Sequence, residues 1–514
     1  MAETCPLLEL SHELLHHVFV DVDHPSDLAR LSLTCRELNN YIRGNRLLHK
    51  EIYVDRYDEP RETTGTTGVK SDWESWLHDM IRLERLLEGS NRYQKQEELE
   101  YAYKHIMRLI ETADPPESKN MHRLRHYFQS PANVDTFLCS SSLFARAGNE
   151  LQRAAQTDGL RQASAKLHCM YGVPIDPVPS RLTSSYQSPD ASLSPSRCTR
   201  LQMRPYPTHT YARSKVYDLR EYTDATLWGP FKDDGQQRVD WEKVEAIMIV
   251  LGFNLNRFTE RSEGRWQKVW DTPFEGANPN SYHPILPATT ATTTCNKEER
   301  PDSDLLKIRS LAATLDSQDP YGVTGTWMRV VCFLDYSDLY AFNFLNNARL
   351  ADGEPRPPVD TEEGLIDLAE SIKLQVTKIV PPSDSHDDEE GCGEEEGLDW
   401  SGFVGTRLPT VHFRGSSRSL HASWDPNANS KIRGTVRQTP EGEIRWTTFS
   451  IFHGEERWRS EGIQVGGLRS ARGVLGNWFD KDHNIHGPAG PTAFWKVTDE
   501  LEEERNSSTP VAYH

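Results

Sequence analysis

Cysteine, long apolar runs and an excess of positive charge are scarce or missing in this sequence. The 514 residues include eight cysteines, none in a Cys-x-x-Cys pair. We therefore predict neither a zinc knuckle nor a disulfide framework, and we expect a reducing compartment. The longest apolar stretch, 246–251, is far too short to span a bilayer. No basic region precedes an apolar run near the first residue, so neither secretion nor a membrane partner is expected.

The charge balance is acidic, which argues against another class of partner. Lys and Arg number 58 and Asp and Glu number 77, for a net charge of −19. A protein that coats a nucleic-acid duplex is expected to be basic, so we predict no nucleic-acid partner. Nine acidic residues and no Lys or Arg lie between Asp384 and Asp399. Such a run of like charges predicts a solvated acidic loop over 383–399.

The apolar pattern changes along the chain. Up to about residue 176, apolar residues recur at spacings of three and four, which predicts helices. Between Pro177 and Cys198, 12 of 22 residues are Ser, Thr or Pro, which is typical of a linker. After about residue 210, short alternating segments separated by turn residues favour an antiparallel sandwich or barrel. The expected fold class is therefore α+β, with segments at 1–54 (three-helix module), 55–176 (helical linker region), 177–209 (Ser/Pro-rich linker), 210–498 (β-rich domain) and 499–514 (polar tail).

Several local elements follow from the same patterns. Residues 326–344 predict two strands joined by a turn at Tyr336-Ser337. Ser26 is placed to cap the second helix of the chain. The other expected strands lie at 372–377, 410–414, 432–438, 443–452, 457–465 and 493–497.

The first 53 residues carry the strongest local signal. A stripe that includes Leu10, Leu14 and Val18 predicts one helix with an apolar face, and two shorter helices follow it. A three-helix module this small cannot bury all of its leucines internally. The surplus apolar face predicts a partner surface, although packing of the module against later parts of its own chain is the alternative.

These segments resemble a known module. The sequences LSHELLHHVF (10–19), PSDLARLS (25–32), TCREL (34–38) and KEIY (50–53) are similar to the F-box, from which the chain departs at Ser11 (usually Pro) and His49 (often Trp). The resemblance implies docking on the Skp-type adaptor of a cullin-RING ubiquitin ligase. The positions that match the family's adaptor contacts are Leu10, Leu14, Val18, Leu28, Leu31, Cys35 and Leu38.

The resemblance also implies a role for the rest of the chain. Segments 160–345 and 410–497 resemble F-box proteins of filamentous fungi, in which a long domain follows the F-box. The implied function is a non-catalytic substrate receptor of an SCF-type ligase, with the adaptor, a cullin scaffold and a target protein as partners. No cofactor is expected, and the location is cytoplasmic, nuclear or both. An F-box scaffold that acts outside a ligase is the alternative.

Two patterns favour a metalloenzyme instead. His12-Glu13-Leu14-Leu15-His16 is a literal HExxH sequence, which on a helix places two histidines on one face with a glutamate as general base. No histidine follows at the third-ligand position of the extended motif. Asp480, Asp482, His483 and His486 also cluster, although a polar loop explains them as well. We predict no metal site and no catalytic residue, and keep a metal-dependent hydrolase as the weakest alternative.

The C-terminal region has a charge pattern of its own. Residues 401–480 contain ten Arg and one Lys against seven acidic residues. Arginine is suited to bidentate capture of phosphate or carboxylate groups. We therefore predict a pocket for an acidic or phosphorylated target, with a solvated sheet face paired to the acidic loop as the alternative. Its candidate residues are Arg433, Arg437, Arg445, Arg457 and Arg459.

Overall fold

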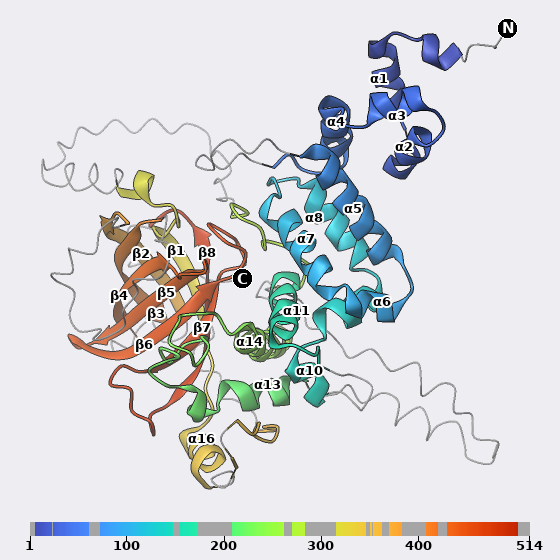
Figure 1. Ribbon diagram of the computed structural model, residues 1–514. Coiled ribbons are helices and arrows are strands. Elements are labelled where there is room, and N and C mark those ends of the chain that lie inside the picture. The colour runs from blue at the N-terminus through green and yellow to red at the C-terminus, as the bar shows by residue number, and fades with distance from the viewer. Residues whose placement is uncertain are drawn as a thin grey trace, which may run out of the picture. The chain divides into compact units, whose positions relative to one another are not determined.

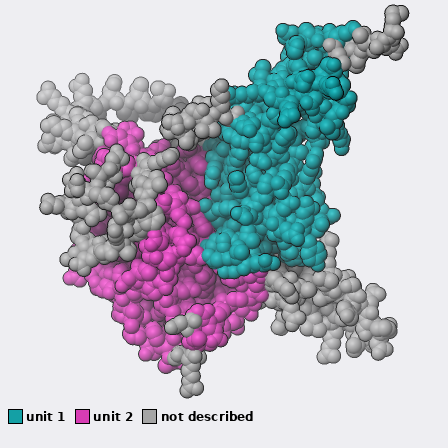
Figure 2. All heavy atoms as spheres, viewed as in Figure 1, with its two compact units in different colours: residues 1–140, 155–167 teal, residues 141–154, 168–514 magenta. Residues whose placement is uncertain are grey.

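The chain folds into two compact units. The computed structural model describes residues 6–22, 24–60, 72–147, 154–172, 208–261, 270–282, 315–345, 350–351, 353–361, 370–382, 408–419 and 429–501. The first unit comprises residues 1–140 and 155–167, and the second comprises 141–154 and 168–514 (Figures 1 and 2). The predicted acidic loop 383–399 lies outside the described residues, as do nearly all of the predicted linker 177–209 and most of the predicted tail 499–514.

The first unit is built from helices. A short 3₁₀ turn at Pro6–Glu9 comes first. The helices that follow are α1 (His12–Val20), α2 (Pro25–Ser32), α3 (Arg36–Ile42), α4 (Arg46–Arg56), α5 (Trp73–Glu88), α6 (Arg92–Glu97), α7 (Leu99–Glu111), α8 (Lys119–Tyr127) and the short α9 (Pro131–Asn133), which continues into a π-turn at Val134–Leu138.

Polar side chains fix where the first helices begin. The Ser11 hydroxyl accepts a hydrogen bond from the Leu14 backbone N–H at 3.4 Å and caps α1. The prediction that Ser26 caps α2 was wrong, because α2 begins one residue earlier, at Pro25, and His24 caps it. Proline suits a first helical position, where its missing N–H has no helical partner to lose.

Further helices follow in the sequence before the barrel, and one of them, α11, begins in the first unit and ends in the second. They are α10 (Ser142–Ala147), α11 (Asp158–Tyr171), α13 (Thr208–Val216), a 3₁₀ turn at Leu219–Glu221 and α14 (Trp241–Arg261). Among the residues that the structure describes, the first strand begins at residue 325, well inside the segment 210–498 that the sequence predicts as β-rich. Within the second unit, Ala246, Ile247, Val250 and Leu251 of α14 are fully buried.

The strands of the second unit close into an antiparallel barrel. Each strand pairs with the next along the chain, and the last pairs with the first. The strands are β1 (Gly325–Val331), β2 (Glu370–Val380), β3 (Thr410–Ser419), β4 (Asn429–Gln438), β5 (Ile444–Phe452), β6 (Glu455–Gln464), β7 (Val474–Asp480) and β8 (Ala489–Thr498). The α+β class is confirmed, and of the two predicted β architectures the structure has the barrel.

One strand of the prediction is a helix. The chain leaves β1 and forms α16 (Tyr336–Tyr340) and a π-turn at Ala341–Leu345, where the sequence predicted a second strand. Asp335 caps α16 by accepting from the Ser337 backbone N–H at 2.9 Å. Leu339 and Phe342 are buried three residues apart, a helical spacing. The partners of β1 come instead from β2 and β8, which are distant in the sequence.

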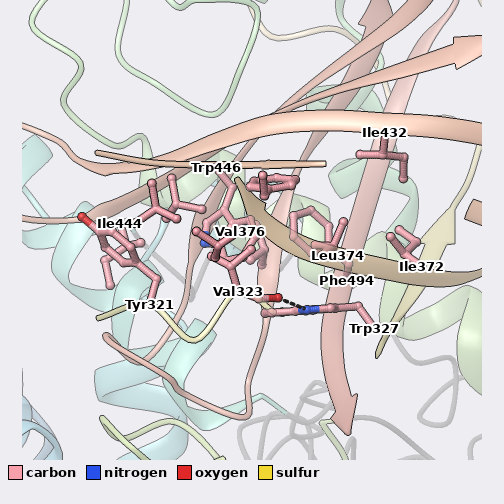
Figure 3. Packing of buried hydrophobic residues seen from close by; sticks show 14 residues of the cluster. Tyr321, Val323, Trp327, Ile372, Leu374, Val376, Ile432, Ile444, Trp446 and Phe494 are labelled. Carbon is pink, nitrogen blue, oxygen red and sulfur yellow. Dashed lines mark hydrogen bonds between the residues drawn. The ribbon is translucent and has the colours of Figure 1, made fainter. Parts of the chain in front are cut away.

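Large side chains fill one end of the barrel. Trp327, Phe413, Trp446 and Phe494 meet there in tilted and edge-to-face ring contacts with centroids 5.1–5.9 Å apart. The Trp327 indole N–H donates to the Val323 carbonyl at 2.9 Å, so this buried polar atom is satisfied (Figure 3). An eight-stranded barrel has an interior just wide enough for side chains to fill, which explains this packed core.

Two glycines bring β6 and β7 close together. Gly462 and Gly476 are register partners. A Cβ on Gly476 would lie 2.1 Å from the Glu461 carbonyl oxygen and 2.6 Å from the Gly462 Cα. Glycine is not typical of a strand interior, which is why β7 is missing from the predicted strands.

Candidate functional site

Helix α1 divides its apolar residues between two faces. Leu15 and Phe19 are buried inside the first unit. Leu14 and Val18, one residue earlier in each case, are 53% and 44% exposed. Because residues four apart lie on the same side of a helix, the exposed pair forms one continuous apolar strip on the outside. This strip is the open part of the predicted adaptor-binding face.

The other five predicted adaptor residues lie deeper. Leu28 and Leu38 are buried, and Leu10, Leu31 and Cys35 are half-buried. The Cys35 thiol accepts a hydrogen bond from the Leu38 backbone N–H at 3.5 Å and so caps α3. Leu28, Leu38 and Cys35 therefore hold the three short helices in place, while Leu14 and Val18 are the members free to contact another protein.

A cavity of about 350 Å³ opens beside α2 within the first unit. Leu28, Ile42, Leu77 and Ile81 contribute apolar walls, and His49 and Glu74 also line it. Leu33, at its edge, is 83% exposed. Sequence reasoning did not identify Leu33, because it falls between two helices and belongs to neither apolar stripe.

The HExxH sequence lies on α1 as predicted, but its histidines have other contacts. His16 Nε2 lies 2.8 Å from a carboxylate oxygen of Glu51 on α4. His12 packs on the Tyr41 ring at 5.4 Å, and its carbonyl accepts the Tyr41 hydroxyl at 2.9 Å. Over the ranges described above, no group of three or more His, Cys, Asp or Glu side chains is placed to hold a metal.

The five arginines predicted to form a pocket lie on the neighbouring strands β4, β5 and β6, and three of them are paired with carboxylates. Arg445 and Arg459, on β5 and β6, both donate to the buried carboxylate of Glu461, at 2.7–3.1 Å. Arg433, on β4, pairs with Glu456 and covers the Phe449 ring. Arg457 is exposed beside Trp458, and Arg437 is half-buried.

Glu461 explains why the guanidinium groups of Arg445 and Arg459 are not available to bind a target. Its carboxyl group has no solvent exposure. Burial alone raises the pKa of this carboxyl, but the charges and hydrogen bonds of Arg445 and Arg459 outweigh burial and hold the pKa below its ordinary value. Sequence reasoning counted the positive charges and missed the one anion that gathers two of them, because Glu461 carries no motif.

A second cavity, of about 390 Å³, lies at the end of the barrel that holds the aromatic core. Trp327, Tyr321 and Gln464 line this cavity. Arg469 and Lys496 add two basic side chains to its lining. The Gln464 side-chain oxygen accepts from the Trp446 indole N–H at 3.0 Å. The mixed lining gives this end of the barrel both apolar surface and hydrogen-bonding groups. No sequence pattern indicated this cavity, which joins β1, β6, β8 and three loops.

The polar cluster near the end of the chain is a structured loop. The Asp482 backbone N–H donates to the Asp480 carboxylate at 2.9 Å, and the His483 ring stacks on Trp228 at 4.9 Å. The His486 N–H donates to the Asn484 side chain at 3.0 Å. These residues form the polar loop that we named as the alternative to a metal site. No described helix has both the length and the apolar character to cross a membrane.

Comparison with known proteins gives one match. Residues 7–50 match the family model of the F-box domain. The matched segment runs from the turn before α1 into α4 and contains all seven predicted adaptor residues. No curated protein and no solved structure matches the chain.

Proposed function

We propose that this chain, which carries an F-box domain at residues 7–50, is the substrate-recognition subunit of an SCF-type cullin-RING ubiquitin ligase. The single observation that carries the proposal is the open apolar strip of Leu14 and Val18 inside that domain. Covering exposed leucine and valine side chains with a partner removes apolar surface from water, which stabilises the complex. A Skp-type adaptor is the partner that an F-box domain implies.

The receptor would act by proximity alone. One surface of the chain holds the adaptor and another holds the target, so a target lysine has a raised effective concentration near a charged conjugating enzyme. Such a role needs no catalytic residue and no cofactor in this chain. We place the target on the second unit, and we place the protein in the cytoplasm, the nucleus or both.

The test is capture of the full chain by a purified Skp-type adaptor. We expect the wild-type chain to bind and the double variant Leu14→Asp plus Val18→Asp to lose binding, because two carboxylates would have to be desolvated in the interface. Both positions are exposed, so the thermal unfolding midpoint should change little. Tyr93→Asp, at an exposed site on α6 outside the F-box domain, is the matched control.

The same experiment separates the alternative roles. Adaptor capture that survives the double change would refute the docking face. Recovery of the adaptor with a cullin supports a ligase subunit, whereas an adaptor complex that never contains a cullin supports a scaffold acting outside a ligase.

A further inference from the structure

Exposed aromatic and apolar side chains of the second unit lie on α16, which Figure 1 labels, and on the loop between β7 and β8 that contacts it. Tyr336 and Leu345 are 51% and 67% exposed, and Ile485 on the loop is 64% exposed. Tyr340 is 38% exposed. We call this set, together with Phe344 and His486, the α16 surface. Its rings form a chain of contacts: Tyr340 to Phe344 at 5.0 Å and Phe344 to His486 at 4.6 Å.

Hydrogen bonds and one buried leucine hold the α16 surface in place. The Tyr336 hydroxyl donates to the His486 carbonyl at 3.2 Å, which joins the helix to the loop. Asn343 accepts from the Leu219 N–H at 2.9 Å and donates to the Tyr217 carbonyl at 3.0 Å. Leu339 is buried beneath the same helix. The outward rings are therefore preorganised, and a partner would lose little entropy in ordering them.

Exposed acidic side chains lie on the same segments as these rings, at α16 and on the loop between β7 and β8. Asp335 and Asp338 are exposed on the α16 side, and Asp482 on the loop has 72% of its side chain exposed. Asp224, which faces His483 at 3.6 Å, is 93% exposed at the side chain. On the loop side, Lys481 is paired with Asp482, and the exposed Arg457 accepts the Lys481 backbone N–H through its carbonyl at 3.2 Å.

We infer that the α16 surface is a docking site for a basic protein segment that carries an apolar anchor residue. The open rings supply stacking and apolar contact for the anchor, and the arginine or lysine side chains of such a segment stack favourably on aromatic faces. The exposed carboxylates of Asp335 and Asp338 complement its charge. This occupant has the opposite charge to the acidic target predicted from the arginine count. Three of those five arginines are paired with Glu461 and Glu456.

The inference rests on the proposed function in one respect, since the segment would belong to the target. The binding itself does not require the adaptor. A fluorescein-labelled peptide of alternating Lys and Leu is the probe, and peptides of Glu and Leu and of Lys and Ser, equal in length, are the comparisons. Binding to the full-length chain is followed by fluorescence anisotropy at physiological salt.

Two variants test the two parts of the surface. We expect Tyr340→Ser plus Ile485→Ser to weaken Lys/Leu peptide binding at least about tenfold by removing the apolar contact. We expect Asp338→Asn plus Asp482→Asn to weaken it by a smaller factor that shrinks as salt is added. The matched controls are Tyr93→Ser and the exposed pair Glu97→Gln plus Glu100→Gln, which should bind as the wild type does.

The outcomes separate this inference from the proposed function. Equal binding by the wild type and both surface variants, or equal binding of the Glu/Leu peptide, would overturn the docking site. So would dimerisation of the wild type that the Tyr340→Ser plus Ile485→Ser variant loses, because the occupant would then be a second copy. Adaptor capture is measured on the same proteins. Loss of peptide binding with adaptor capture intact counts against the docking site only, and the reverse result counts against the ligase role only.

Discussion

Arg445 Nε donates a hydrogen bond of 2.8 Å to the Glu461 carboxylate on the outer face of the barrel, and neither side chain has more than 1% exposure. The second nitrogen, Nη2, donates to the other carboxylate oxygen at 3.1 Å, so the pair is bidentate. Arg459 and the Thr447 hydroxyl also donate to Glu461. The buried carboxylate of Glu461 on β6 therefore binds Arg445 and Thr447 of β5 as well as Arg459 of its own strand, and so links β5 to β6.

Removal of that anion should destabilise the second unit. We predict that Glu461→Gln lowers the free energy of unfolding by about 3–5 kcal/mol, since it leaves the buried Arg445 charge uncompensated. Urea denaturation followed by tryptophan fluorescence measures the change. The control is Glu456→Gln, which breaks the exposed pair with Arg433 and should change stability by no more than about 1 kcal/mol. Equal effects of the two variants would contradict the role given to Glu461.

The same carboxylate should make stability depend on pH. Burial raises the pKa of Glu461, but its two arginine partners hold it below the ordinary 4.5. A carboxyl with a depressed folded-state pKa contributes stability above the unfolded-state pKa, and this is lost as the pH falls through the folded-state pKa. We therefore expect the wild type to lose more stability than Glu461→Gln as the pH falls below about 4.5. Parallel pH profiles of the urea midpoint for the two proteins would show that Glu461 has no such shift.

The two faces of the F-box helices predict two different phenotypes. Leu28→Ala should lower stability by about 2–5 kcal/mol because Leu28 is buried beside the cavity of the first unit. Leu14→Ala should change stability by no more than about 0.5 kcal/mol, since its side chain is half exposed. It should nevertheless weaken adaptor capture. The two measurements are urea denaturation and adaptor binding, and a Leu14→Ala protein that is unstable but binds normally would reverse the assignment.

Two glycines should respond in opposite directions to the same substitution. Gly476→Ala places a Cβ against the backbone of β6, at 2.1 Å from a carbonyl oxygen, so we expect a large loss of stability or failure to fold. Gly252→Ala, in the middle of α14, meets nothing within 4 Å and should stabilise the protein by about 0.5–1 kcal/mol. Thermal unfolding of the two variants provides the comparison. A stable Gly476→Ala protein would mean that β6 and β7 are further apart than described.

Local patterns in the sequence determined a good part of this protein. The spacing of apolar residues in the first 53 positions was enough to predict α1, α2 and α3 but not α4, which begins at Arg46. Four short segments resembled the F-box, and residues 7–50 match the model of that family. Strands β2 to β6 and β8 were visible because alternating apolar residues and turn residues act over a few positions. These signals need no distant partner, so the chain itself displays them.

Tertiary contacts decided the rest. Leu14 and Leu28 read alike in the sequence, yet one is exposed and the other buried, because burial depends on which helices pack together. β7 was not predicted because it contains Gly476, which allows the close approach of β7 to β6. Tyr336 follows a strand but lies on a helix capped by Asp335. Of the five arginines counted toward one pocket, Arg433 pairs with Glu456, and Arg445 and Arg459 pair with Glu461, since pairing across a barrel is set by strand register rather than by composition.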